Sequence, residues 1–167
     1  GYDPVVPMPV FFLWHGTAGA GNADAQAQAV RSLWGSHAES GQFIVVSQVG
    51  TGSQGQWVSS EVATFNAIVD DMQSAYNIET SRMYLWGFSS GGHWMHALGI
   101  LYADRFAAYA INAGDLRFAA GNNVFPADAD RQMPVYVSIG SSDPNLPFAE
   151  NDRLAFLQAG WFENKNF

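Results

Sequence analysis

One short stretch of the sequence combines a serine with glycines in the spacing of a catalytic turn. Ser89 lies between Gly87 and Gly91 in the pattern Gly-x-Ser-x-Gly. The apolar run 83–86 precedes it, and a segment with helical periodicity follows it. A serine on a tight turn between a strand and a helix is presented to a substrate, and the glycines let the helix pass close to the strained turn. This context is typical of a nucleophile, but an ordinary serine in a glycine-rich helix cap fits the same pattern. The other parts of the site decide between them, and together with the strand-end motifs below they predict that Ser89 is a nucleophile.

Two other predicted strands end in residues that would complete such a site. Residues 15–17, His-Gly-Thr, directly follow the apolar run 10–14, and Asp143 closely follows the run 135–139. The carboxyl ends of parallel strands are where functional groups gather, so we expect these residues to lie near Ser89. A serine hydroxyl is a weak nucleophile until a base takes its proton, and an acid such as Asp143 holds a histidine base in the right tautomer.

The tetrahedral intermediate of such a reaction carries an oxyanion, which backbone N–H groups must stabilise. We expect these donors to be the N–H of Ser90, at the start of the helix, and the N–H of Thr17, with Gly16 giving the turn its room. The loss of one such donor typically costs about 3–4 kcal/mol of barrier.

Several neighbouring residues have both a chemical and a structural interpretation. Asp115 follows the predicted strand 107–111 and competes with Asp143 as the acid, although we expect it to shape the pocket rim. Asp143 itself stands in ordinary turn sequence. Phe88 precedes the nucleophile, so we expect it to point toward the substrate, and Trp57, in a polar loop, is a candidate for the acyl or aryl side of the pocket.

The histidines do not supply an obvious base. The chain contains four, all before Asp143: His15, His37, His93 and His96. We expect His15 to brace its loop by hydrogen bonds. His93 lies on a helix that leads away from the Ser89 hydroxyl, which makes it an unattractive substitute base. His93 and His96 are one helical turn apart, but the sequence places no acidic partner beside them, so no metal site is predicted.

The composition restricts the classes of function. Hydrophobic residues make up 48% of the 167 residues and charged residues 13%, as in a compact globule with a sizeable core. The net charge of −8 argues against nucleic acid and anionic membrane partners, since both require clusters of Lys and Arg. The sequence has no cysteine, which excludes disulfides, thiolate zinc sites and a cysteine nucleophile.

Apolar runs alternate with segments of helical periodicity along the chain. Buried strands separated by helices are typical of a parallel sheet with helices on both faces, so we predict one α/β domain over residues 1–167. The predicted strands are 10–14, 43–47, 83–86, 107–111 and 135–139. The predicted helices are 25–37, with Gly41 as its stop, 62–76, 94–102, and 150–159, with Gly160 as its stop.

Three segments together resemble a known family. They are the motif at 15–17, the stretch 87–92 followed by Tyr-Ala-Asp-Arg-Phe at 102–106, and Gly-Ser-Ser-Asp-Pro at 140–144. This combination resembles the polyhydroxybutyrate depolymerase / feruloyl esterase-like group of α/β-hydrolases. The resemblance implies an α/β-hydrolase fold and a secreted serine esterase with a Ser-Asp-His triad and no cofactor. It also implies small-molecule or polymeric ester substrates, of the short-chain, aryl (feruloyl-type) or polyester kind, and an acyl-enzyme.

The sequence departs from that family toward both ends. In the family the histidine lies beyond one more strand after the Asp143 segment, and antiparallel strands precede the His15 segment. We therefore interpret the chain as a hydrolase core trimmed at both ends. Without its base such a site retains only about 10³–10⁴-fold catalysis over water, so we expect the 167-residue chain alone to be a very poor esterase.

The alternatives to an esterase are a non-catalytic binding domain that lacks the base and a serine peptidase of the same fold. The oligomeric state stays open.

Overall fold

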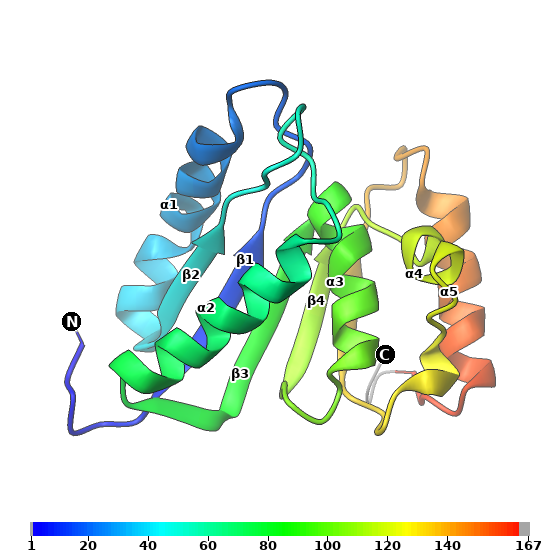
Figure 1. Ribbon diagram of the computed structural model, residues 1–167. Coiled ribbons are helices and arrows are strands. Elements are labelled where there is room, and N and C mark those ends of the chain that lie inside the picture. The colour runs from blue at the N-terminus through cyan, green and yellow to red at the C-terminus, as the bar shows by residue number, and fades with distance from the viewer. Residues whose placement is uncertain (1, 164–167) are drawn as a thin grey trace.

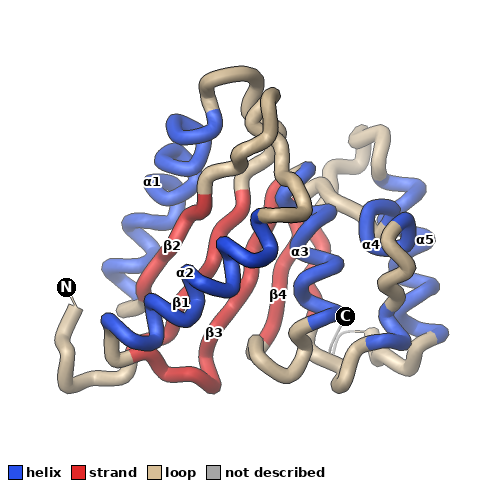
Figure 2. Tube along the Cα trace, viewed as in Figure 1, coloured by secondary structure: helices blue, strands red, loops and turns tan. Residues whose placement is uncertain are grey.

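The computed structural model describes residues 2–163, which form a five-stranded sheet with helices packed against it (Figure 1, Figure 2). All neighbouring strands run parallel, in the order β2-β1-β3-β4-β5. The strands are β1 (Met8–Trp14), β2 (Ile44–Gln48), β3 (Ile78–Phe88), β4 (Ala108–Asn112) and β5 (Val135–Ser138). The helices are α1 (Ala23–Gly41), α2 (Glu61–Ala75), α3 (Ser90–Leu101), α4 (Arg117–Gly121), the 3-10 turn η1 (Pro126–Asp128) and α5 (Leu146–Gln158).

The parallel sheet expected from the apolar runs is confirmed, with differences at the ends of elements. β3 begins at Ile78 rather than at Met83. Residues 80–82 of this strand are polar and exposed, so no apolar pattern reveals them. The short helix α4 and the turn η1 were not predicted, because a segment of a few residues carries too little periodicity to be recognised.

Helices cover both faces of the sheet, as predicted. Successive residues of a strand point to opposite faces. Phe12 of β1 packs edge-on against Phe65 of α2, with ring centroids 5.6 Å apart, whereas the adjacent Phe11 stacks on Trp34 of α1 at 5.5 Å. α1 therefore lies on one face and α2 on the other, where Figure 1 shows α3 beside α2.

The end of α1 and the start of α5 differ from their predicted positions. Gly41 is the last residue of α1, and Gln42 takes the left-handed conformation that ends the helix, with φ of 51°. α5 begins at Leu146 instead of residue 150, with a proline in its first turn. Gly160, with φ of 91°, follows the end of α5 as expected.

The first turn of α3 lies against the end of β1 with no side chain between them. A Cβ atom on Gly91 would be 2.4 Å from the carbonyl oxygen of Trp14 and 2.6 Å from that of His15. A Cβ on Gly87 would be 2.4 Å from the carbonyl oxygen of Gly91. Because all these contacts are with backbone atoms, no side chain can move away to relieve them. Both glycines on either side of Ser89 are therefore required by packing.

We predict that Gly91→Ala lowers the free energy of unfolding by about 3 kcal/mol, because the added methyl group overpacks two backbone carbonyls. Gly35→Ala in α1 is the matched control. A Cβ there meets no atom within 4 Å, and alanine in a helix should raise stability by about 0.5–1 kcal/mol. Urea unfolding followed by circular dichroism measures both variants, and equal stability of the two would contradict the packing argument.

Candidate active site

Ser89 occupies the turn between β3 and α3, and its backbone is strained. Its φ is 51° and its ψ is −119°, a combination that costs a non-glycine residue about 1–3 kcal/mol. Two hydrogen bonds hold this conformation: Ser89 N–H donates to the carbonyl of Asn112 at 2.9 Å, and His93 N–H donates to the carbonyl of Ser89 at 3.0 Å. The strain expected of a nucleophile turn is present as a positive φ, and the bond to the end of the neighbouring strand β4 helps to hold it.

The loop after β1 lies directly against this turn. A Cβ on Gly16 would be 3.2 Å from the Cβ of Ser89 and 3.1 Å from the ring of Phe88. The Phe88 side chain is 43% exposed, so it stands at the surface beside both residues. Thr17, the residue after Gly16, is exposed. Of the predicted site residues, the structure thus brings together Gly16, Phe88 and Ser89.

Ser90 is the first residue of α3, where backbone N–H groups have no partner within the helix. Its N–H is therefore available to an anion beside Ser89, as is required of an oxyanion donor. Its hydroxyl Oγ is buried and has no hydrogen-bond partner among the described residues. That Ser90 and Thr17 aim their N–H groups at one point stays a prediction.

His15 braces the loop after β1 by hydrogen bonds, as expected. Its side chain is fully buried, and Nδ1 lies 2.6 Å from the Gly16 carbonyl oxygen, while the Gly50 N–H donates to Nε2 at 3.0 Å. These bonds assign the ring proton to Nδ1. Burial lowers the pKa of His15, against the smaller opposing effects of the Gly16 carbonyl and Glu61. His15 is therefore a neutral structural group.

Trp57 is buried, although its neighbours in the sequence are polar and suggested an exposed loop residue. It is 5% exposed, its ring stacks on Trp14 with centroids 3.9 Å apart, and its Nε1–H donates to the His15 carbonyl at 2.7 Å. The structure thus gives Trp57 a place in the core beneath the His15 loop. Contact with a substrate stays a prediction for this residue.

Asp143 follows β5, which is separated from β3 by β4 alone. Its side chain is half-buried, and Oδ1 accepts a hydrogen bond from the Asn145 N–H at 2.8 Å. Residues 143–145 therefore form a turn, as their sequence suggested. Asp143 follows the carboxyl end of β5 and so lies at the same edge of the sheet as Ser89. The role of Asp143 as the acid of a triad stays a prediction.

Asp115, the competing acid, is tightly engaged. It is fully buried, and Arg117 donates to both of its oxygens, at 2.9 Å and 2.7 Å. The Nδ1 atom of His93 lies 3.4 Å from Asp115 Oδ1. Burial alone would raise the pKa of Asp115, but the bonds from His93 and Arg117 hold it well below its usual range. The same Arg117 also donates to Asn145 Oδ1 at 2.7 Å, which links the loops after β4 and β5.

His93 and His96 occupy separate environments. The hydrogen bond with Asp115 raises the pKa of His93, against the effect of burial. His96 is fully buried beside Tyr109, and burial lowers its pKa to about 3. Within residues 2–163 no group of three His, Asp or Glu side chains is arranged to hold a metal ion.

Sequence reasoning missed two residues that shape this site, Glu61 and Arg117. Glu61 is charged by type yet only 1% exposed, and its position at the start of a helix is the one signal that the sequence offers. Arg117 lies just two residues after Asp115, so the spacing allows the pair but does not require it.

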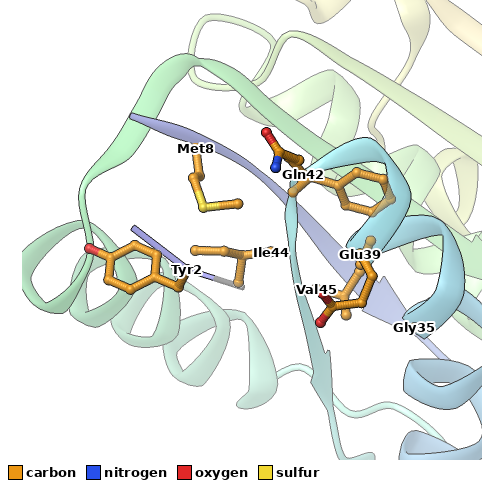
Figure 3. Close-up of a pocket in the computed structure, with 9 residues that line it drawn as sticks. Tyr2, Met8, Gly35, Glu39, Gln42, Ile44 and Val45 are labelled. Atoms are coloured by element: carbon orange, nitrogen blue, oxygen red, sulfur yellow. The ribbon is translucent and has the colours of Figure 1, made fainter. Parts of the chain in front are cut away.

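A surface pocket lies at the opposite end of the sheet. Figure 3 shows Tyr2, Met8, Gln42 and Ile44 around it, at the amino-terminal ends of β1 and β2. Ser89 follows the carboxyl end of β3, so this pocket holds none of the predicted catalytic residues.

Over the described part of the chain, no helix is both long and apolar enough to cross a membrane.

Comparison with known proteins gives relatives among esterases, although no protein-family model matches the sequence. The chain is 30% identical to a bifunctional acetylxylan esterase/xylanase of Neocallimastix patriciarum over 146 residues, which are 85% of this chain and 20% of that protein. It is 26% identical to feruloyl esterase C of Emericella nidulans over 160 residues, 93% of this chain and 56% of that protein. The chain therefore spans from a fifth to just over half of these relatives.

Solved structures agree on the architecture. The esterase PE8 superposes with a TM-score of 0.71 at 14% identity, covering 95% of this chain and 81% of that one. SOBER1 of Arabidopsis thaliana superposes with a TM-score of 0.67 at 16% identity, covering 92% and 84%. The chain thus has the α/β-hydrolase fold, and its sequence is similar to proteins named as feruloyl and acetylxylan esterases.

Proposed function

We propose that the chain is the catalytic core of a serine carboxylic ester hydrolase that works through an acyl-enzyme on Ser89. The observation that carries this proposal is the strained turn at Ser89, with the Gly16 loop packed against it. A protein retains such strain where the surrounding structure imposes it, and these conformations cluster at active sites. The homology to feruloyl and acetylxylan esterases supports the same reaction class.

The reaction assigns one task to each residue. The Ser89 hydroxyl oxygen attacks the ester carbonyl carbon while its proton passes to a histidine base, a residue that no position after Asp143 in this sequence supplies. The carbonyl electron pair moves to oxygen, where the N–H groups of Ser90 and Thr17 stabilise it. Collapse restores the carbonyl and expels the alcohol, which takes the proton. Water then attacks the acyl-enzyme in the same way, which releases the acid and the free serine.

The substrate class follows from the surroundings of Ser89 and from the relatives. Phe88 offers an exposed aromatic ring beside the nucleophile, which suits aryl esters of the feruloyl type and short acyl chains, and polyesters belong to the same reaction class. Relatives named as an acetylxylan esterase/xylanase and a feruloyl esterase support a secreted enzyme that meets its substrate outside the cell. Asp143 is the proposed acid of the triad.

The first test is Ser89→Ala, assayed in the full reading frame that contains this chain. Hydrolysis of p-nitrophenyl acetate and methyl ferulate should fall to background, and a fluorophosphonate probe should no longer label the protein, because only an activated serine reacts with it. Ser32→Ala, at an exposed position of α1, should change neither readout. Turnover that survives Ser89→Ala would refute the proposal. Preferential cleavage of peptide anilides would instead identify a peptidase, and unlabelled Ser89 a binding domain.

The two candidate acids can be separated by one pair of variants. Asp143→Asn should lower kcat by about 10⁴-fold, as expected for loss of the acid that orients the base, with little change in stability. Asp115→Asn should instead lower the thermal midpoint of unfolding, because Arg117 and His93 lose a buried charged partner. A folded Asp143→Asn protein with full activity would remove Asp143 from the mechanism.

A further inference from the structure

A buried carboxylate lies at the start of α2, beside the loop that follows β2. Glu61, the first residue of α2, is 1% exposed. A buried carboxylate is costly unless hydrogen bonds satisfy it. Here both oxygens are engaged, because Oε1 accepts the N–H of Thr51 and Oε2 accepts the N–H of Val58 at 2.8 Å. Glu61 therefore holds both ends of the loop that follows β2.

That loop is in turn bonded to the segment after β1. The Gly50 N–H donates to His15 Nε2 at 3.0 Å, and the Trp57 indole donates to the His15 carbonyl at 2.7 Å. The Gly19 N–H donates to the Gln54 carbonyl at 2.8 Å. Apart from the packing of Trp57 against Trp14 and His15, the residues on both sides of this contact are mostly small or polar, so these hydrogen bonds contribute strongly to how the two loops fit together. The position of His15 thus depends on the loop that Glu61 holds.

The last link is a single peptide group. The Gly16 carbonyl oxygen accepts from His15 Nδ1 at 2.6 Å. The Gly16 carbonyl and the Thr17 N–H belong to the same planar trans peptide unit, so they point in opposite directions. Fixing the carbonyl toward His15 therefore turns the Thr17 N–H the other way. Gly16 itself lies against Ser89, because a Cβ atom on Gly16 would be 3.2 Å from the Ser89 Cβ, so this peptide unit belongs to the segment next to the nucleophile turn.

We propose that Glu61 is a positioning residue that sets the Thr17 oxyanion donor through His15, an inference that rests on the esterase function proposed above. Glu61 touches neither substrate nor nucleophile. Its two bonds fix the loop 50–58, this loop fixes His15, and His15 fixes the orientation of the Gly16–Thr17 peptide. Because the oxyanion develops in the transition state, this chain of contacts acts on kcat and leaves substrate affinity unchanged.

The test is Glu61→Gln in the full reading frame that contains this chain, with Glu150→Gln as the control. Glutamine keeps the size of the side chain but turns an NH₂ group toward one of the two N–H donors, so one bond is lost. We expect kcat to fall about 10- to 100-fold with KM within about twofold, since a displaced oxyanion donor loses much of its effect. Glu150 is an exposed carboxylate of α5, and its variant should behave as the parent.

Trp57→Phe gives a second readout if Glu61→Gln folds poorly. Phenylalanine can keep the contact with Trp14 but removes the bond to the His15 carbonyl. A fall in kcat at constant KM supports the positioning role, whereas a rise in KM alone would make Trp57 a substrate contact and count against it. His15→Gln combined with Glu61→Gln should lose no more activity than His15→Gln alone, because both act through one peptide group.

The outcomes separate this inference from the function on which it rests. Activity is expressed per folded molecule, from the amplitude of the unfolding transition. If Ser89→Ala abolishes turnover while folded Glu61→Gln keeps its full kcat, the positioning role is wrong and the esterase function stands. If Ser89→Ala leaves turnover intact, the proposed function itself fails.

Discussion

The backbone contact between Gly91 and the end of β1 is the constraint on which the rest of the site depends. It brings the first turn of α3 within touching distance of the carbonyls of Trp14 and His15, a distance that no side chain at this position would allow. The start of α3 and the loop after β1 then share one corner of the sheet. Ser89 lies at that corner because its N–H is bonded to the end of β4. The strain at Ser89 is thus imposed by three parallel strands and one helix.

Two buried carboxylates hold the loops on either side of this corner. Glu61 binds backbone N–H groups and supports the loop after β1, whereas Asp115 binds Arg117 and lies beside His93 between the loops after β4 and β5. Each is costly to bury alone and each is satisfied by hydrogen bonds, so removal of one partner would leave an uncompensated charge. Loops at the carboxyl edge of a parallel sheet need this support, since they carry little apolar surface of their own.

The sequence predicted those features that depend on local pattern. Apolar runs located all five strands. The spacing of glycines around Ser89 located the strained turn, because backbone atoms approach so closely there that only glycine fits at positions 87 and 91. Features that depend on long-range pairing were not visible. Trp57 stands among polar residues, and nothing nearby indicates that its ring stacks on Trp14, 43 positions earlier in the chain. The start of β3 carries polar residues because that end of the strand is exposed.

Ser89, Ser90 and Thr17 are proposed to form one nucleophile and oxyanion site. A crystal structure of the full reading frame after reaction with a fluorophosphonate would show whether they do. We expect a covalent bond from Ser89 Oγ to phosphorus, with the phosphoryl oxygen about 3 Å from both the Ser90 and the Thr17 backbone nitrogens. A phosphoryl oxygen turned to solvent, or an adduct on any other residue, would contradict it.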